Sequence, residues 1–207
     1  MNNKSIQSEK LPPGWKWVKL GEIGFFDSGG TPSKSNEAFW NGKIPFVTGA
    51  DITSFYIDHN NARAYLSEVG LHSGKTAICE AGIVLLVTRT RVGRVGIVRE
   101  LMGVSQDISP YKCGNNVSPE YVCRYIQSIS DHLIDNCRGA TIQGLTKDFI
   151  NKLQIPLPPL SEQKRIVKIL EGKLAAVEKA KKAAEGKLEL INKLPQSYLK
   201  QAFEGKL

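Results

Sequence analysis

A proline-rich stretch followed by a long heptad pattern constrains this chain more than any other feature. Residues 155–160 contain Pro156, Pro158 and Pro159, which fix the backbone φ angle and lack amide donors. We expect these residues to form a rigid, polyproline-like strut that ends a globular domain of residues 1–160. A helical arm of residues 161–207 should then begin at Ser161, whose hydroxyl group is a suitable N-cap.

The arm carries apolar residues at alternating spacings of three and four, which is typical of a coiled-coil seam. The predicted seam, and dimer interface, consists of Val167, Leu170, Leu174, Val177, Lys181, Ala184, Leu188 and Ile191. It spans roughly 45 Å of helix at about 1.5 Å per residue. Gly172 and Gly186 each cost about 1 kcal/mol of helix stability relative to Ala, and Pro195 is expected to end or kink the helix. The alternative is an amphipathic helix folded back on its own domain.

Composition predicts an ordinary globular chain with a basic surface. The 207 residues are 41% hydrophobic and 23% charged, with a net charge of +8, which suffices for one sizeable core. The arm contributes eleven Lys or Arg against six Glu. The polar N-terminus lacks the apolar segment of a signal peptide, and no run is long enough for a membrane span, so we expect a cytoplasmic protein without membrane contact.

Cysteine and histidine spacing argues against a metal site. The four cysteines lie far apart without a C-x-x-C pair, which indicates reduced, mostly buried thiols. The three histidines, His59, His72 and His132, are scattered, and none pairs with a nearby cysteine or acid in a metal-ligand spacing, so we interpret them as surface or satisfied core residues. No metal ligands are therefore predicted.

Hydrophobic patterns within residues 1–160 predict a mixed α/β domain, so the fold class is α+β with a long C-terminal coiled-coil helix. The expected elements are a strand or helix at 16–23, strands at 44–48, 83–87 and 95–98, a helix at 119–133 and a short segment at 147–153. Residues 83–87 should form a central strand with 95–98 as its neighbour. Two polar loops with glycines, 27–36 and 139–146, connect these elements.

Four stretches, residues 11–20, 29–51, 88–109 and 139–167, resemble the specificity subunits of Type I restriction-modification systems and occur in the order found in that family. Three motifs carry the resemblance. The first is Gly-Gly-Thr-Pro-Ser at 29–33 followed by residues 39–47, the second is Ser-Gln-Asp-Ile-Ser-Pro at 105–110, and the third runs from Gly144 to Gln163. Members of this family usually contain two target-recognition domains, each followed by a conserved helix. This chain shows each feature once, without an internal repeat. It is thus similar to half of such a subunit, with one target-recognition domain and one arm.

The resemblance implies a non-catalytic DNA-binding subunit of an enzyme complex. It would position a methyltransferase subunit, which carries S-adenosylmethionine and methylates adenine, and a restriction subunit. The chain would bind no cofactor itself. The sequence contains neither an Asn-Pro-Pro-Tyr or Asp-Pro-Pro-Tyr segment nor a Walker A loop. The alternative class is a stand-alone dimeric DNA-binding regulator or inhibitor without a methylase, and a compact nuclease or methyltransferase is disfavoured.

Two antiparallel arms would rebuild the two-domain form as a homodimer. Each domain would then read the same half-site on opposite strands of double-stranded DNA, so the target would be an interrupted palindrome.

Polar side chains at loop tips are the predicted DNA contacts. They are Thr31, Ser33, Lys34, Arg89, Thr90, Arg91, Arg94, Arg138, Thr141, Gln143 and Lys147. The arginines at 89–94 suit phosphates or guanine edges, and the amide of Gln143 suits adenine. Gln106 and Asp107 belong to the second motif and are interpreted as residues that hold the fold.

Overall fold

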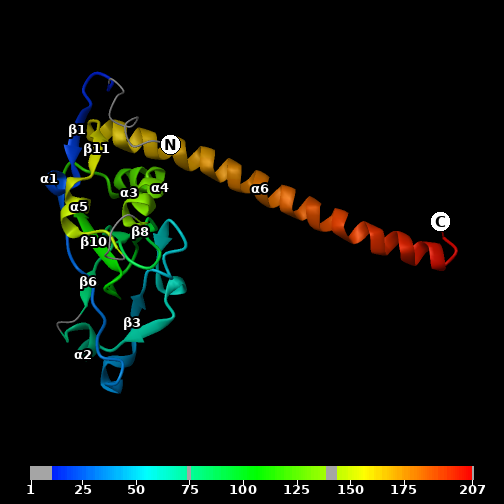
Figure 1. The fold of residues 1–207 in the computed structure, drawn as a ribbon, viewed down its shortest axis with the longest axis horizontal. Helices are drawn as coiled ribbons and strands as arrows, with labels where there is room; N and C mark the ends of the chain where they lie inside the picture. Colours follow the sequence, from blue (N-terminus) through cyan, green and yellow to red (C-terminus); the bar gives the residue numbers. More distant parts are fainter. Residues whose placement is uncertain (1–10, 74–75, 139–143, 207) are drawn as a thin grey trace. The chain divides into compact units, whose positions relative to one another are not determined.

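The computed structural model describes residues 11–73, 76–138 and 144–206. It divides into a globular unit, Met1–Lys164, and a helical unit, Arg165–Leu207. The division falls shortly after residue 160, where the sequence predicts the domain boundary. Figure 1 colours the ribbon along the chain and labels several of its helices and strands.

The globular unit contains a 5-stranded sheet with strand order β2-β10-β7-β8-β4. Its strands are β2 (Gly24–Phe26), β10 (Ile108–Cys113), β7 (Val84–Val87), β8 (Val95–Val98) and β4 (Tyr56–Ile57). β7 lies at the centre, is buried along its whole length, and pairs antiparallel with β8 and β10. The predicted central strand at 83–87 and its neighbour at 95–98 are therefore confirmed, since an unbroken apolar run can be buried on both faces.

A second, 4-stranded sheet has the order β5-β3-β9-β6. It consists of β5 (Ala64–Leu66), β3 (Trp40–Val47), β9 (Met102–Val104) and β6 (Ala77–Cys79). Most of the predicted strand at 44–48 lies within β3. Buried side chains from both sheets, including Val47, Leu85 and Val104, form one hydrophobic cluster. The two sheets are thus layers around a shared core, as the α+β prediction requires.

Helices cover the five-stranded sheet. α3 (Pro119–Ser128) packs on β7 and β8, while α1 (Leu20–Ile23) packs against α5 (Lys147–Lys152). The remaining short elements are α2 (Glu68–Leu71) and the two 3-10 turns Glu37–Phe39 and His59–Asn61.

The single helix predicted for 119–133 is wrong, because α3 ends before Ile129 and α4 (Ser130–Arg138) follows it. Ile129 has φ −108° and ψ 16°, outside helical geometry. The break is invisible in the sequence pattern, because Ile126, Ile129 and Leu133 all remain buried.

The predicted polyproline strut is also wrong over much of its length. Residues 154–157 form β11 (Gln154–Leu157), which pairs antiparallel with β1 (Lys16–Lys19) and places Pro156 opposite Trp17. A strand with one neighbour tolerates proline, because the missing amide can face away from the ladder. The Tyr125 hydroxyl donates to the Gln154 carbonyl at 2.7 Å, which fastens α3 to this strand.

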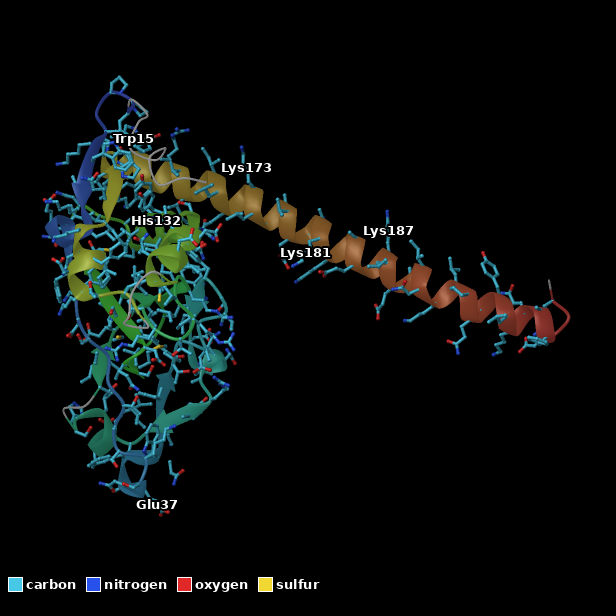
Figure 2. All side chains as sticks on the ribbon, in the orientation of Figure 1. Trp15, Glu37, His132, Lys173, Lys181 and Lys187 are labelled. Carbon is cyan, nitrogen blue, oxygen red and sulfur yellow. The ribbon has the colours of Figure 1, made fainter. Side chains whose placement is uncertain are left out.

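The arm is the helix α6 (Leu160–Phe203), of 44 residues. Ser161 is not its N-cap, because the carbonyl of Pro159 already accepts from the amides of Glu162 (2.9 Å) and Gln163 (3.0 Å). Of the two outcomes predicted for Pro195, an end or a kink, the end does not occur, because the helix continues through this residue. In Figure 2 the side chains of Lys173, Lys181 and Lys187 project from its surface. No helix in the described ranges has both the length and the apolar character needed to cross a bilayer.

Candidate nucleic-acid interface

The hairpin between β7 and β8 carries the predicted cationic loop. Thr90 (φ 59°) and Gly93 (φ 87°) adopt left-handed backbone geometry, which turns the chain sharply between the strands. The loop is fixed at its base, because the amide of Gly93 donates to the Val87 carbonyl at 3.2 Å and the amide of Val87 to the Arg94 carbonyl at 2.9 Å. A rigid base positions side chains more accurately than a free loop.

The arginines of this hairpin differ in their surroundings. Arg89 and Arg91 are exposed, whereas Arg94 is half-buried. Nη1 of Arg94 donates to the carbonyl oxygens of Ala50 at 3.2 Å and Ile52 at 3.5 Å. Arg94 therefore braces a neighbouring loop, which leaves Arg89 and Arg91 as the cations of the hairpin that face solvent.

The predicted loop at 27–36 lies against the second family-like motif. The amide of Gly30 donates to the Val104 carbonyl at 3.0 Å, and the Thr31 hydroxyl donates to Oε1 of Gln106. A side chain on Gly29 would place its Cβ 2.0 Å from the Ser105 carbonyl oxygen, so only glycine allows this approach. The interpretation of Gln106 as a residue that holds the fold agrees with its contact to Thr31.

The other polar side chains of this loop have local partners or face solvent. Ser33 and Ser35 share a hydroxyl hydrogen bond of 2.8 Å, and Nε1 of Trp40 donates to the Ser33 carbonyl at 3.1 Å. Lys34 is exposed. A cleft of about 550 Å³, bordered by Thr31, Lys34 and Trp40, lies beside this loop.

Backbone hydrogen bonds bring the predicted loops together. The Asp107 carbonyl accepts from the amides of Thr88 (2.8 Å) and Arg89 (3.3 Å). The Thr88 carbonyl in turn accepts from the amide of Leu145 at 2.9 Å. The 27–36 loop, the 105–107 turn, the arginine hairpin and the start of the 144–147 segment therefore form one continuous surface, although they are distant in sequence.

The remaining predicted contacts lie on two helices or outside the described residues. Lys147 begins α5 and is exposed, and Arg138 ends α4. Thr141 and Gln143 lie outside the described residues.

His59 and His72 are exposed, in agreement with their interpretation as surface residues, and each lies beside an acidic side chain. Nδ1 of His59 lies 2.7 Å from Oε1 of Glu100, and Nδ1 of His72 lies 3.8 Å from Oε2 of Glu68. Asp58 stands beside the first pair, but its carboxylate already accepts from the Asn60 amide at 2.8 Å. This trio is therefore occupied in capping and ion pairing.

Burial keeps the cysteine thiols protonated. It raises the pKa values of Cys79, Cys113 and Cys123 to about 12. The thiolate is the nucleophile and metal ligand, so these side chains are poor candidates for either role at neutral pH.

The predicted seam of the arm is mostly uncovered. Leu174, Val177, Leu188 and Ile191 are 44%, 63%, 57% and 58% exposed. Lys181 and Ala184 are exposed as well, Leu170 is half-buried, and Val167 is buried. Large apolar side chains in a row leave a surface that another helix could cover.

Sequence comparison identifies relatives along most of the chain. The model of the Type I restriction modification DNA specificity domain matches residues 12–185. The Type I restriction enzyme MjaIX specificity subunit of Methanocaldococcus jannaschii is 26% identical over 185 residues, which cover 88% of this chain and 43% of the relative. The EcoR124I/EcoR124II specificity subunit of Escherichia coli is 27% identical over 163 residues, which cover 75% of this chain and 40% of that subunit. The chain thus spans less than half the length of these relatives.

Solved structures show the same fold. The HsdS subunit from Thermoanaerobacter tengcongensis superposes with a TM-score of 0.71 at 26% identity, covering 97% of this chain and 47% of that subunit. A chain from a study of complex assembly and conformational transition in a type I R-M system gives a TM-score of 0.78 at 26% identity. The match covers 97% of this chain and 48% of that chain.

Proposed function

Because the chain belongs to the family of Type I restriction modification DNA specificity domains, we propose that it supplies DNA sequence specificity to a restriction-modification complex. The observation that carries this proposal is the continuous loop surface, on which Arg89, Arg91 and Lys34 are exposed. Arginine and lysine at loop tips contact phosphates and position a protein on the duplex. Polar side chains around them, such as Thr31, then read base edges.

The chemistry belongs to partner subunits in this proposal. A methyltransferase subunit would hold S-adenosylmethionine and modify adenine, and a restriction subunit would cleave, while this chain binds no cofactor. The buried, protonated thiols support a non-catalytic role. We place the complex in the cytoplasm, where such thiols stay reduced.

The chain forms a homodimer through its arm in the same proposal. The exposed apolar seam supports this arrangement. Antiparallel arms related by a two-fold axis would present two identical recognition domains to opposite strands. The target would be an inverted repeat of one half-site with a fixed spacer.

Selection from random duplex DNA tests this function. The chain, alone and reconstituted with a Type I methyltransferase subunit, is incubated with the library, and the bound DNA is sequenced. We expect enrichment of a split, symmetric sequence, and adenine methylation within it by the reconstituted complex. Symmetric enrichment without any association with the methyltransferase would support the stand-alone regulator instead. Failure to enrich any sequence in either form would refute DNA specificity.

A further inference from the structure

A groove of about 1240 Å³ lies between the arginine hairpin and the helices α3 and α4. Its floor and walls come from the 52–55 loop, the 90–95 segment of the hairpin, and side chains of both helices. Three arginines, Arg91, Arg94 and Arg124, border it, and among the described residues no carboxylate does. The rest of the lining mixes hydroxyl and amide side chains, including Thr90, Gln127 and Ser130, with apolar ones such as Ile52, Val92 and Ile134. The groove is therefore electropositive and rich in hydrogen-bond donors.

Arg124 is held in a fixed orientation within this groove. Its guanidinium carbon lies 3.7 Å from the centre of the Phe55 ring, and its Nη1 donates to Oε1 of Gln127 at 2.9 Å. Stacking on an aromatic face holds the planar cation while its edges stay free to donate. The side chain is thus preorganised before any ligand arrives.

One donor of this preorganised cation lacks an acceptor. Nε of Arg124 is buried and has no hydrogen-bond partner among the described residues. A buried donor without a partner costs about 1–3 kcal/mol, so most such groups in folded proteins are satisfied. Nε itself is enclosed by protein atoms, so a ligand in the groove would meet the other nitrogens of the half-buried guanidinium, and a phosphodiester group offers oxygen acceptors for them.

We propose that this groove binds the sugar-phosphate backbone of DNA, with Arg124 and Arg91 as its cations. The inference rests on the proposed function and extends the contact surface from the hairpin onto α3 and α4. Arg94 is not counted among the phosphate ligands, because it already donates to Ala50 and Ile52. Since phosphates carry no sequence information, the contact strengthens binding to every duplex alike.

Salt-dependent DNA binding by the full chain, alone and in complex with the methyltransferase subunit, tests the groove. Arg124→Gln keeps a polar side chain of similar reach and removes the charge. We expect about tenfold weaker binding to specific and random duplexes, and a salt slope smaller by about 0.9, the value for one lost phosphate contact. The matched control is Arg99→Gln. Arg99 also stacks on an aromatic ring, 4.1 Å from the centre of Tyr56, but does not border the groove, so its slope should equal that of the wild type.

A second variant covers the case in which loss of Arg124 unfolds the domain. Gln127→Glu is isosteric and places a negative charge beside Arg124, so the fold persists while phosphate binding weakens and the salt slope falls. Unchanged slopes in both Arg124→Gln and Gln127→Glu, with wild-type binding intact and Arg89→Ala weakened, would overturn the groove alone, because Arg89 is exposed on the hairpin but does not border the groove. Lower affinity with an unchanged slope would mean that Arg124 only supports Phe55. Absence of DNA binding by the wild type in both forms would overturn the proposed function as well.

Discussion

At the residue scale, neighbouring arginines of one hairpin have different roles. Arg91 is exposed, whereas Arg94 donates to the carbonyl oxygens of Ala50 and Ile52. An exposed cation contributes to DNA affinity through released counterions, while a half-buried one contributes to stability through its hydrogen bonds.

Arg91→Ala and Arg94→Ala should therefore separate binding from stability. Arg91→Ala should weaken DNA binding and lower the salt slope by about 0.9 without changing the melting temperature. Arg94→Ala should lower the free energy of unfolding by about 2 kcal/mol, because charged hydrogen bonds to the 50–52 loop are lost. Urea unfolding and fluorescence anisotropy measure the two effects. If urea unfolding gave the same free energy of unfolding for both variants, the bracing role of Arg94 would be contradicted.

Gln163 is a buried polar residue whose role the sequence did not indicate. It is 0% exposed, its Oε1 accepts from the Ser118 amide at 2.8 Å, and its Nε2 donates to the carbonyls of Asn116 (3.1 Å) and Pro158 (2.9 Å). The side chain thus joins the N-cap of α3 to the segment that precedes α6.

Gln163→Ala should destabilise the globular unit by about 3 kcal/mol, because it leaves two buried backbone groups, the Ser118 amide and the Pro158 carbonyl, and the partly buried Asn116 carbonyl without this partner. Gln163→Glu should be intermediate, since a carboxylate can accept but not donate. The free energy of unfolding in urea checks both, with exposed Gln106→Ala as the comparison at another glutamine. A loss below about 1 kcal/mol for Gln163→Ala would show that water replaces these bonds.

Buried thiols make stability fall at alkaline pH. The pKa values of Cys79 and Cys123 rise from 9.0 to about 12 because both are desolvated. Above pH 9 the unfolded chain loses these protons while the folded chain keeps them, so the unfolded state gains stability. The stabilisation is fully present below pH 9 and is lost between pH 9 and about 12, by up to about 1.4 kcal/mol per pH unit for each group.

Urea unfolding at pH 8, 9, 10 and 11 measures this decline. Replacing both Cys79 and Cys123 by Ala should flatten part of the pH dependence, although it lowers stability at pH 8. If the double variant loses as much free energy of unfolding between pH 8 and pH 11 as the wild type, the decline comes from other groups, such as the buried tyrosines.

At the element scale, α6 contains three residues of low helix propensity. Gly172, Gly186 and Pro195 all lie inside it. Proline removes the amide that would bond to the Ile191 carbonyl, and glycine leaves the unfolded backbone more freedom. Intrinsic propensity therefore opposes the helix at these three positions, and covering the apolar seam would stabilise it.

Pro195→Ala and Gly186→Ala should strengthen the arm. Helix stability should rise by up to about 3 kcal/mol in Pro195→Ala and by about 1 kcal/mol in Gly186→Ala. Circular dichroism at 222 nm during heating measures the change, and the melting of the globular unit serves as an internal reference. If neither variant changes the arm transition, packing rather than propensity determines its stability.

At the scale of the whole molecule, the uncovered seam predicts a dimer. Light scattering should give a mass of about twice the 22.8 kDa of one chain. Leu188→Lys places a charge in the seam and should shift the chain toward monomer. Leu190→Lys is the control, because Leu190 is similarly exposed (66%) but lies outside the seam. A wild-type monomer at micromolar concentration would contradict the symmetric-target proposal.

Local patterns in the sequence were enough to predict several elements of the molecule. The apolar run at 83–87 predicted a buried central strand, and the heptads predicted the long helix, because burial on both faces and a repeating stripe are local properties. The cationic hairpin followed from turn residues between two strands. The family resemblance was likewise visible in short motifs along the chain.

Only the tertiary structure decided which of these segments meet. The contact between Thr31 and Gln106 joins residues separated by 75 positions, and that between His59 and Glu100 joins residues separated by 41. The brace formed by Arg94, the stack of Arg124 on Phe55 and the break between α3 and α4 depend in the same way on packing. Such contacts arise when distant segments close around a shared core, so a periodicity read within one segment does not contain them.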